Sequence, residues 1–96
     1  MAEKNNETVE LRLEGKVQGV LLRESLKTKA KSLKITGLVR NQIDGSVKLI
    51  VQGNKNKVEE LISWLKNKPL SLAEIIIKLQ DRIDQPKEFH DFQIIW

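Results

Sequence analysis

Residues 15–23 read Gly15-Lys16-Val17-Gln18-Gly19-Val20-Leu21-Leu22-Arg23, and this segment separates a strand pattern from a helix pattern. Before it, the apolar residues at 9, 11 and 13 alternate with polar ones, which is the period of a half-buried strand. After it, the apolar residues at 22, 26, 30 and 33 recur at helical spacing. A loop between a strand and a helix N-terminus directs backbone N–H groups and the positive end of the helix dipole at one point. The segment therefore predicts an anion site suited to a phosphoryl group.

The residue types inside the loop support this interpretation. Gly15 and Gly19 let the main chain curl without Cβ clashes, so that consecutive amides can form an anion-binding nest. Arg23 offers a planar donor fork that suits two phosphate oxygens. We expect Lys16 to raise the local positive potential and Gln18 to brace the loop.

The rest of the chain alternates between strand and helix patterns. Each assignment follows from apolar periodicity and from turn residues. The pattern predicts strands over 36–41 and 46–52, joined by an Asp-Gly hairpin turn, and then a helix that Asn54 caps and Pro69 ends. It next predicts a strand over 73–79, a polar turn over 84–87 and a short last strand over 92–96. The order is β-α-β-β-α-β, with a possible break in the last strand region. Right-handed crossovers then predict an α+β sandwich, with two helices on one face of a four-stranded antiparallel sheet.

Two blocks of sequence resemble the acylphosphatase family, from about residue 9 to the C-terminus. They read Gly15-x-Val17-Gln18-Gly19-Val20-x-x-Arg23, then Gly37-Leu38-Val39-Arg40-Asn41-x-x-x-Gly45-x-Val47 with Gly53 beyond. Members of this family are small metal-independent enzymes that hydrolyse the carboxyl–phosphate bond of acyl phosphates. The resemblance implies a ferredoxin-like fold, this hydrolase activity, and neither a metal nor another cofactor.

The resemblance also assigns roles to residues. Arg23 and Asn41 are the implied catalytic residues, Arg23 holding phosphate oxygens and Asn41 orienting the attacking water. The implied phosphate-binding residues are, besides Arg23, Gly15, Lys16, Val17, Gln18, Gly19 and Val20. The expected ligands are a small acyl phosphate as substrate, and inorganic phosphate or sulfate as product or analogue.

Two positions depart from the family pattern, which usually has an aromatic residue at each. Here Leu22 precedes the arginine and Leu38 follows the second-block glycine. Both leucines keep apolar bulk, so the fold should persist. The departures keep open an alternative, a catalytically weak or inactive anion-binding module on the same fold.

Composition bounds the remaining possibilities. The chain has 96 residues, a net charge of +4 and no cysteine, so it predicts one domain without disulfides or thiolate metal sites. We expect residues 1–7 to be a flexible segment and residues 8–96 to be the acylphosphatase-like domain. No apolar run reaches the roughly 20 residues that span a bilayer, so we expect no membrane contact. We also expect the protein to be cytoplasmic and monomeric. The central strands carry no aromatic residue for base stacking, which argues against nucleic-acid binding.

Overall fold

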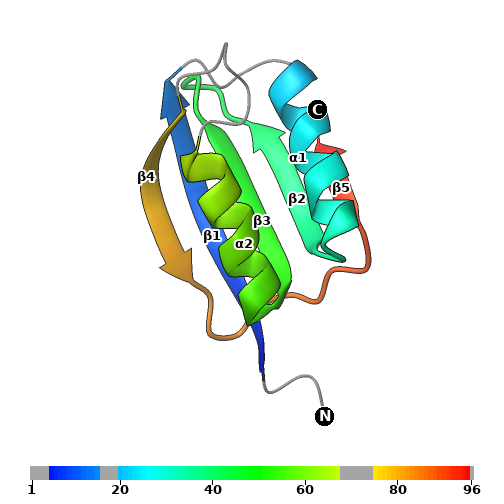
Figure 1. Ribbon diagram of the computed structural model, residues 1–96. Helices are drawn as coiled ribbons and strands as arrows, with labels where there is room; N and C mark the ends of the chain where they lie inside the picture. Colours follow the sequence, from blue (N-terminus) through cyan, green and yellow to red (C-terminus); the bar gives the residue numbers. More distant parts are fainter. Residues whose placement is uncertain (1–4, 16–19, 68–74, 96) are drawn as a thin grey trace.

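The computed structural model describes residues 5–15, 20–67 and 75–95. Within these ranges the elements are β1 (Asn6–Gly15), α1 (Val20–Ser32), β2 (Thr36–Asn41), β3 (Val47–Asn54), α2 (Lys55–Lys66), β4 (Ile75–Arg82) and β5 (Phe92–Ile95). β1 begins at Asn6, inside the segment 1–7 that the sequence predicts to be flexible. Both helices cover the same face of the sheet, as predicted (Figure 1). In the part of the chain that is described, no helix is long and apolar enough to cross a membrane.

The sheet confirms the ferredoxin-like arrangement and adds a strand to it. The described strands form one sheet in the order β4-β1-β3-β2-β5. The neighbours β4-β1, β1-β3 and β3-β2 are antiparallel, as expected, whereas β5 pairs parallel to β2. The prediction of a four-stranded, purely antiparallel sheet therefore lacks β5 and its parallel pairing with β2. The two apolar segments near the C-terminus are separate strands, and they lie at opposite edges of the sheet.

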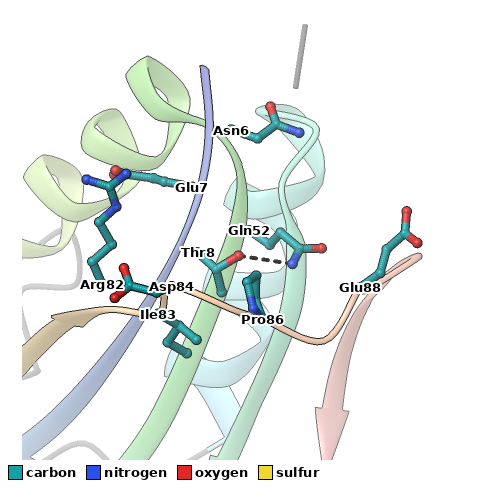
Figure 2. A pocket seen from close by; sticks show the side chains of 9 residues that line it. All are labelled: Asn6, Glu7, Thr8, Gln52, Arg82, Ile83, Asp84, Pro86 and Glu88. Atoms are coloured by element: carbon teal, nitrogen blue, oxygen red, sulfur yellow. Dashed lines mark hydrogen bonds between the residues drawn. The ribbon is translucent and has the colours of Figure 1, made fainter. Parts of the chain in front are cut away.

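Gln52 holds the segment that crosses from β4 to β5. Its Nε2 donates to Thr8 Oγ1 at 3.0 Å (Figure 2) and to the carbonyl oxygen of Lys87 at 2.8 Å, and its Oε1 accepts from the Phe89 N–H at 2.8 Å. These bonds use both amide hydrogens and the amide oxygen of one side chain. Pro86 lacks an N–H, so the strand pattern is interrupted here. The crossing segment is thus tied to the sheet at the end where β1 begins.

The core lies between the helices and the covered face of the sheet. Alternate residues of β1 and β3 point into it, and α2 contributes the predicted stripe, since all four of its residues are buried: Val58, Leu61, Ile62 and Leu65. The predicted N-cap is confirmed, because Asn54 Oδ1 accepts a hydrogen bond from the Asn56 N–H at 2.9 Å. Pro69, predicted to end this helix, lies outside the described residues.

The hairpin between β2 and β3 confirms the Asp-Gly turn, with a loop longer than two residues. Gly45 N–H donates to the Gln42 carbonyl at 3.2 Å, and Gln42 N–H donates to the Ser46 carbonyl at 2.8 Å. Gly45 has a φ of 94°, the left-handed conformation that follows a type I turn in three-residue hairpin loops. Asp44 Oδ1 accepts from Ser46 Oγ at 2.6 Å and from Ser46 N–H at 3.0 Å. The hydroxyl and the N–H of Ser46, with the Arg12 charge, lower the pKa of Asp44.

Gly37→Ala should strongly destabilise the protein. Gly37 has a φ of 142°, and a Cβ there would lie 1.9 Å from the Ile50 carbonyl oxygen of the adjacent strand. Backbone strain and steric overlap together should reduce the free energy of unfolding by roughly 3 kcal/mol. Urea denaturation measures this loss.

Gly45→Ala is the matched control, because it shares a positive φ but meets no atom within 4 Å. It should cost about 1 kcal/mol, the strain of the left-handed conformation alone. Equal losses for the two variants would contradict the steric argument.

Ser46→Ala should raise the pKa of the Asp44 carboxyl toward its ordinary value of 3.8. The Ser46 hydroxyl is the largest cause of the lowering, because it donates to the charged form. A lowered folded pKa means that the bonds of Asp44 contribute to stability at higher pH and are lost as the pH falls through that pKa. A ¹³C NMR titration of the Asp44 carboxyl measures the shift.

Ser63→Ala, at an exposed position of α2, should leave the Asp44 titration unchanged. If the titration midpoint of Asp44 in Ser46→Ala equals that of the parent protein, the Ser46 hydroxyl does not cause the lowered pKa of Asp44.

Candidate active site

One row of the sheet brings the ends of β1 and β2 together. Val47 of β3 pairs with Leu13 on one side and with Asn41 on the other. Neighbouring strands lie about 4.8 Å apart, so the Cα atoms of Leu13 and Asn41 are roughly 10 Å apart. Gly15 follows Leu13 by two residues, and α1 begins at Val20. The end of β1, the start of α1 and the end of β2 therefore meet at one end of the sheet (Figure 1).

Asn41 faces the helix-covered side of the sheet. It alternates in phase with Val39 and Gly37, which are both buried, and its row partners Leu13 and Val47 are fully buried. Its Oδ1 is buried and accepts no hydrogen bond from the described residues. A buried acceptor without a partner costs about 1–3 kcal/mol. Such an atom indicates a position that serves a ligand or a water molecule.

Arg23 lies in the first turn of α1 and is only 5% exposed. Arginine is seldom buried to this extent, because its charge is costly to remove from water. The first turn of α1 carries no acidic residue, so no carboxylate there offsets the positive end of the helix dipole. Arg23 and the positive end of the α1 dipole thus lie together at the start of α1.

The structure describes the two ends of the predicted phosphate loop. Gly15 has a φ of 100°, the left-handed conformation in which a glycine lets the strand turn into a loop. Val20 opens α1. The intervening candidates lie outside the described residues: Lys16, Val17, Gln18 and Gly19. Their part in phosphate binding stays a prediction.

The two leucines that depart from the family pattern occupy different environments. Leu22 is buried in the core beside Arg23 in sequence. Leu38 alternates out of phase with Asn41, so it lies on the opposite, helix-free face of the sheet. Only the Leu22 position is therefore on the side of the sheet that Asn41 faces.

A network beside the site was not predicted from the sequence. Arg12 on β1 forms an ion pair and a hydrogen bond with Asp44 of the hairpin, and its Nε lies 3.1 Å from Glu14 Oε2. The Asp-Gly pair predicted a turn, but nothing in the local pattern indicated its contact with a residue 32 positions earlier. Gln42, next to Asn41, accepts a hydrogen bond from Arg40 Nε at 3.4 Å.

The pocket in Figure 2 lies at the other end of the sheet. It has a volume of about 320 Å³, and its walls come from the start of β1, the end of β3 and the segment after β4. Neither Arg23 nor Asn41 lines it. Among the described residues, no group of three or more His, Cys, Asp or Glu side chains could hold a metal ion.

Comparison with known proteins gives a consistent result. The acylphosphatase family model matches residues 9–94. An acylphosphatase of Caldanaerobacter subterraneus subsp. tengcongensis is 39% identical over 87 residues, which cover 91% of this chain and 96% of that protein. The structure of an acylphosphatase from Coxiella burnetii superposes with a TM-score of 0.77 at 28% identity, covering 99% of this chain and 98% of that one.

A crystal structure of acylphosphatase from Bacillus subtilis shares the fold, with a TM-score of 0.85 at 24% identity over 94% of this chain and 99% of that one. The ferredoxin-like sheet agrees with these matches. Since the family model spans nearly the whole chain, this protein belongs to the acylphosphatase family.

Proposed function

We propose that this chain hydrolyses the carboxyl–phosphate bond of small acyl phosphates, with Arg23 and the loop over 15–20 holding the phosphoryl group and Asn41 orienting the attacking water. The observation that carries the proposal is the buried Oδ1 of Asn41, which accepts no hydrogen bond from the described residues, at the end of the sheet where α1 begins. A water molecule donating to this oxygen would have its own lone pair free to attack phosphorus.

The reaction needs few protein groups. Water oxygen forms a bond to phosphorus while the bond between phosphorus and the carboxyl oxygen breaks, and the leaving carboxylate takes the bonding electron pair. The water proton passes to a phosphate oxygen or to solvent, giving inorganic phosphate. A carboxylate has a conjugate acid with a pKa of about 4, so it leaves without a general acid. The transition state is loose in most analyses, so positioning and charge stabilisation supply most of the acceleration.

Each candidate group has a distinct task in this scheme. Arg23, with the amides of the loop, would bind the three phosphoryl oxygens and offset the charge that they carry. Asn41 cannot accept a proton at neutral pH, so its contribution would be to align water rather than to act as a base. No step calls for a metal ion, and a chelator should leave the rate unchanged.

The alternative function is a phosphate- or anion-binding module with little or no catalysis. The buried Leu22, where the family usually has an aromatic residue, is the observation that favours it. A steady-state assay with a synthetic aryl acyl phosphate separates the two functions, since both bind phosphate and only one turns substrate over.

We further propose that the protein acts as a monomer in the cytoplasm on freely diffusing small molecules. The net charge of +4 suits attraction of small anions, and the absence of cysteine is compatible with a reducing compartment. Light scattering tests the first point, and cell fractionation tests the second.

Arg23→Ala should weaken competitive inhibition by inorganic phosphate roughly 100-fold, because it removes a bidentate, charge-assisted contact. Inhibition constants measured in the acyl phosphate assay report this loss. Arg40→Ala is the control. Arg40 is an exposed cation next to Asn41 at the end of β2, and it points to the helix-free face of the sheet. Near-normal phosphate inhibition of Arg23→Ala would exclude Arg23 from the site.

Asn41→Ala should lower kcat on the order of 100-fold and change phosphate inhibition less than about threefold, since water alignment matters only for the chemical step. Steady-state kinetics measure both constants. A parallel loss of phosphate affinity would assign Asn41 to binding, and an unchanged kcat would remove it from the mechanism.

A further inference from the structure

The pairing of β1 with β3 stops short of the candidate site. Its last pair is Leu13 with Val47, and beyond that row Glu14 and Gly15 pair with β4 alone. Asn41 lies in this last row, and the turn over 42–46 that follows it extends past the ladder that joins β3 to β1. The separation between this turn and Gly15, where the phosphate loop starts, is therefore not determined by sheet hydrogen bonds.

The space between these two segments is open and polar. A pocket of about 320 Å³ lies there, lined by Arg12, Glu14, Gly15, Asp44, Gly45 and Ser46. None of these side chains is a large apolar one. At this opening, beyond the buried row of Leu13 and Val47, the turn and the end of β1 face each other through polar side chains and glycine.

Arg12 spans this opening. Its Nη2 donates to Asp44 Oδ2 in the hairpin, and its Nε lies 3.1 Å from Glu14 Oε2, one residue before Gly15. Asp44 uses its other oxygen to accept from the N–H and Oγ of Ser46. One guanidinium thus joins the residue that precedes the loop to the carboxylate that organises the turn.

From these contacts we infer that Arg12 and Asp44 are positioning residues for hydrolysis: their ion pair fixes the turn over 42–46, which directly follows Asn41, relative to the end of β1 at Gly15. The inference rests on the proposed function, since it concerns how that function's two parts are aligned. The pair touches neither the phosphoryl group nor the attacking water, and it acts through Asn41 and the loop.

Such a pair should influence turnover more than stability. The side chains of Arg12 and Asp44 are 46% and 53% exposed, and exposed ion pairs contribute about 0–1 kcal/mol to folding. Catalytic geometry is far more sensitive, because a displacement of about 1 Å can cost on the order of 100-fold in rate. A loss of kcat without a matching loss of stability is the signature that a merely structural contact would not give.

Two substitutions test the pair. Asp44→Asn keeps an oxygen for the Ser46 bonds and removes the charge that binds Arg12, while Arg12→Gln removes the guanidinium. Each variant should lower kcat for an aryl acyl phosphate about tenfold, with the inhibition constant of inorganic phosphate within about threefold of the parent value. The double variant should be no more than about twofold slower than either single one, because both remove the same interaction.

Glu10→Gln is the matched control. It breaks the pair between Glu10 and Lys48, whose charged atoms lie 4.0 Å apart and whose side chains are 33% and 36% exposed, respectively. Glu10 lies on the same face of the sheet as Arg12, but it pairs with Ile50 of β3 and not with the turn over 42–46. Its kcat should equal that of the parent. A kcat of Asp44→Asn within twofold of the parent, an equal loss in Glu10→Gln, or multiplicative losses in the double variant would each overturn the inference.

A measurement that does not depend on turnover separates this inference from the proposed function. The side-chain NH₂ resonances of Asn41, identified by their absence in Asn41→Ala, should shift in Asp44→Asn and remain in place in Glu10→Gln. If the parent protein hydrolyses no acyl phosphate, the proposed function fails and these resonances still report whether the pair positions Asn41. Unmoved Asn41 resonances in Asp44→Asn would overturn the inference whatever the activity.

Discussion

Val47 pairs with Leu13 on one side and with Asn41 on the other, and the position of Asn41 follows from this row. Because strand side chains alternate between faces, a slip of one residue in either ladder would turn Asn41 toward the helix-free face. The register is secured by the buried residues that share the row, since a slip would also expose them. The apolar core thus determines where a polar amide is placed.

The site is built from polar groups at the margin of that core. Asn41 follows Val39 by two positions, and Arg23 follows Leu22 directly, so each polar group is held by a buried apolar neighbour on the same rigid element. Groups mounted on strands and helices keep their geometry better than groups on loops. Asn41 and Arg23 are each mounted in this way, one on a strand and the other on a helix.

The sequence was sufficient for the fold class because its signals are local and consistent. Period-two and helical patterns identified the elements, and the Asn54 cap and the Asp-Gly turn appear where predicted. The last strand was predicted over 92–96, but its parallel pairing with β2 as a fifth strand of the sheet was not, because that pairing depends on Gln52 and the crossing segment, which are far apart in sequence. The ion pair between Arg12 and Asp44 escaped detection for the same reason. Asn41 was assigned by resemblance, and only the three-dimensional structure shows that its buried oxygen accepts no hydrogen bond within residues 5–15, 20–67 and 75–95.

The crossing segment over 83–91 lies at the end of the sheet where β1 begins, and the catalytic candidates lie at the end where β1 finishes. The candidate catalytic residues and the segment that connects the two edge strands are thus at opposite ends of the sheet. Peptides inserted into that segment would lengthen the chain at the end of the sheet remote from Asn41. The fold thereby offers a point of attachment for additional modules that is well separated from the candidate site.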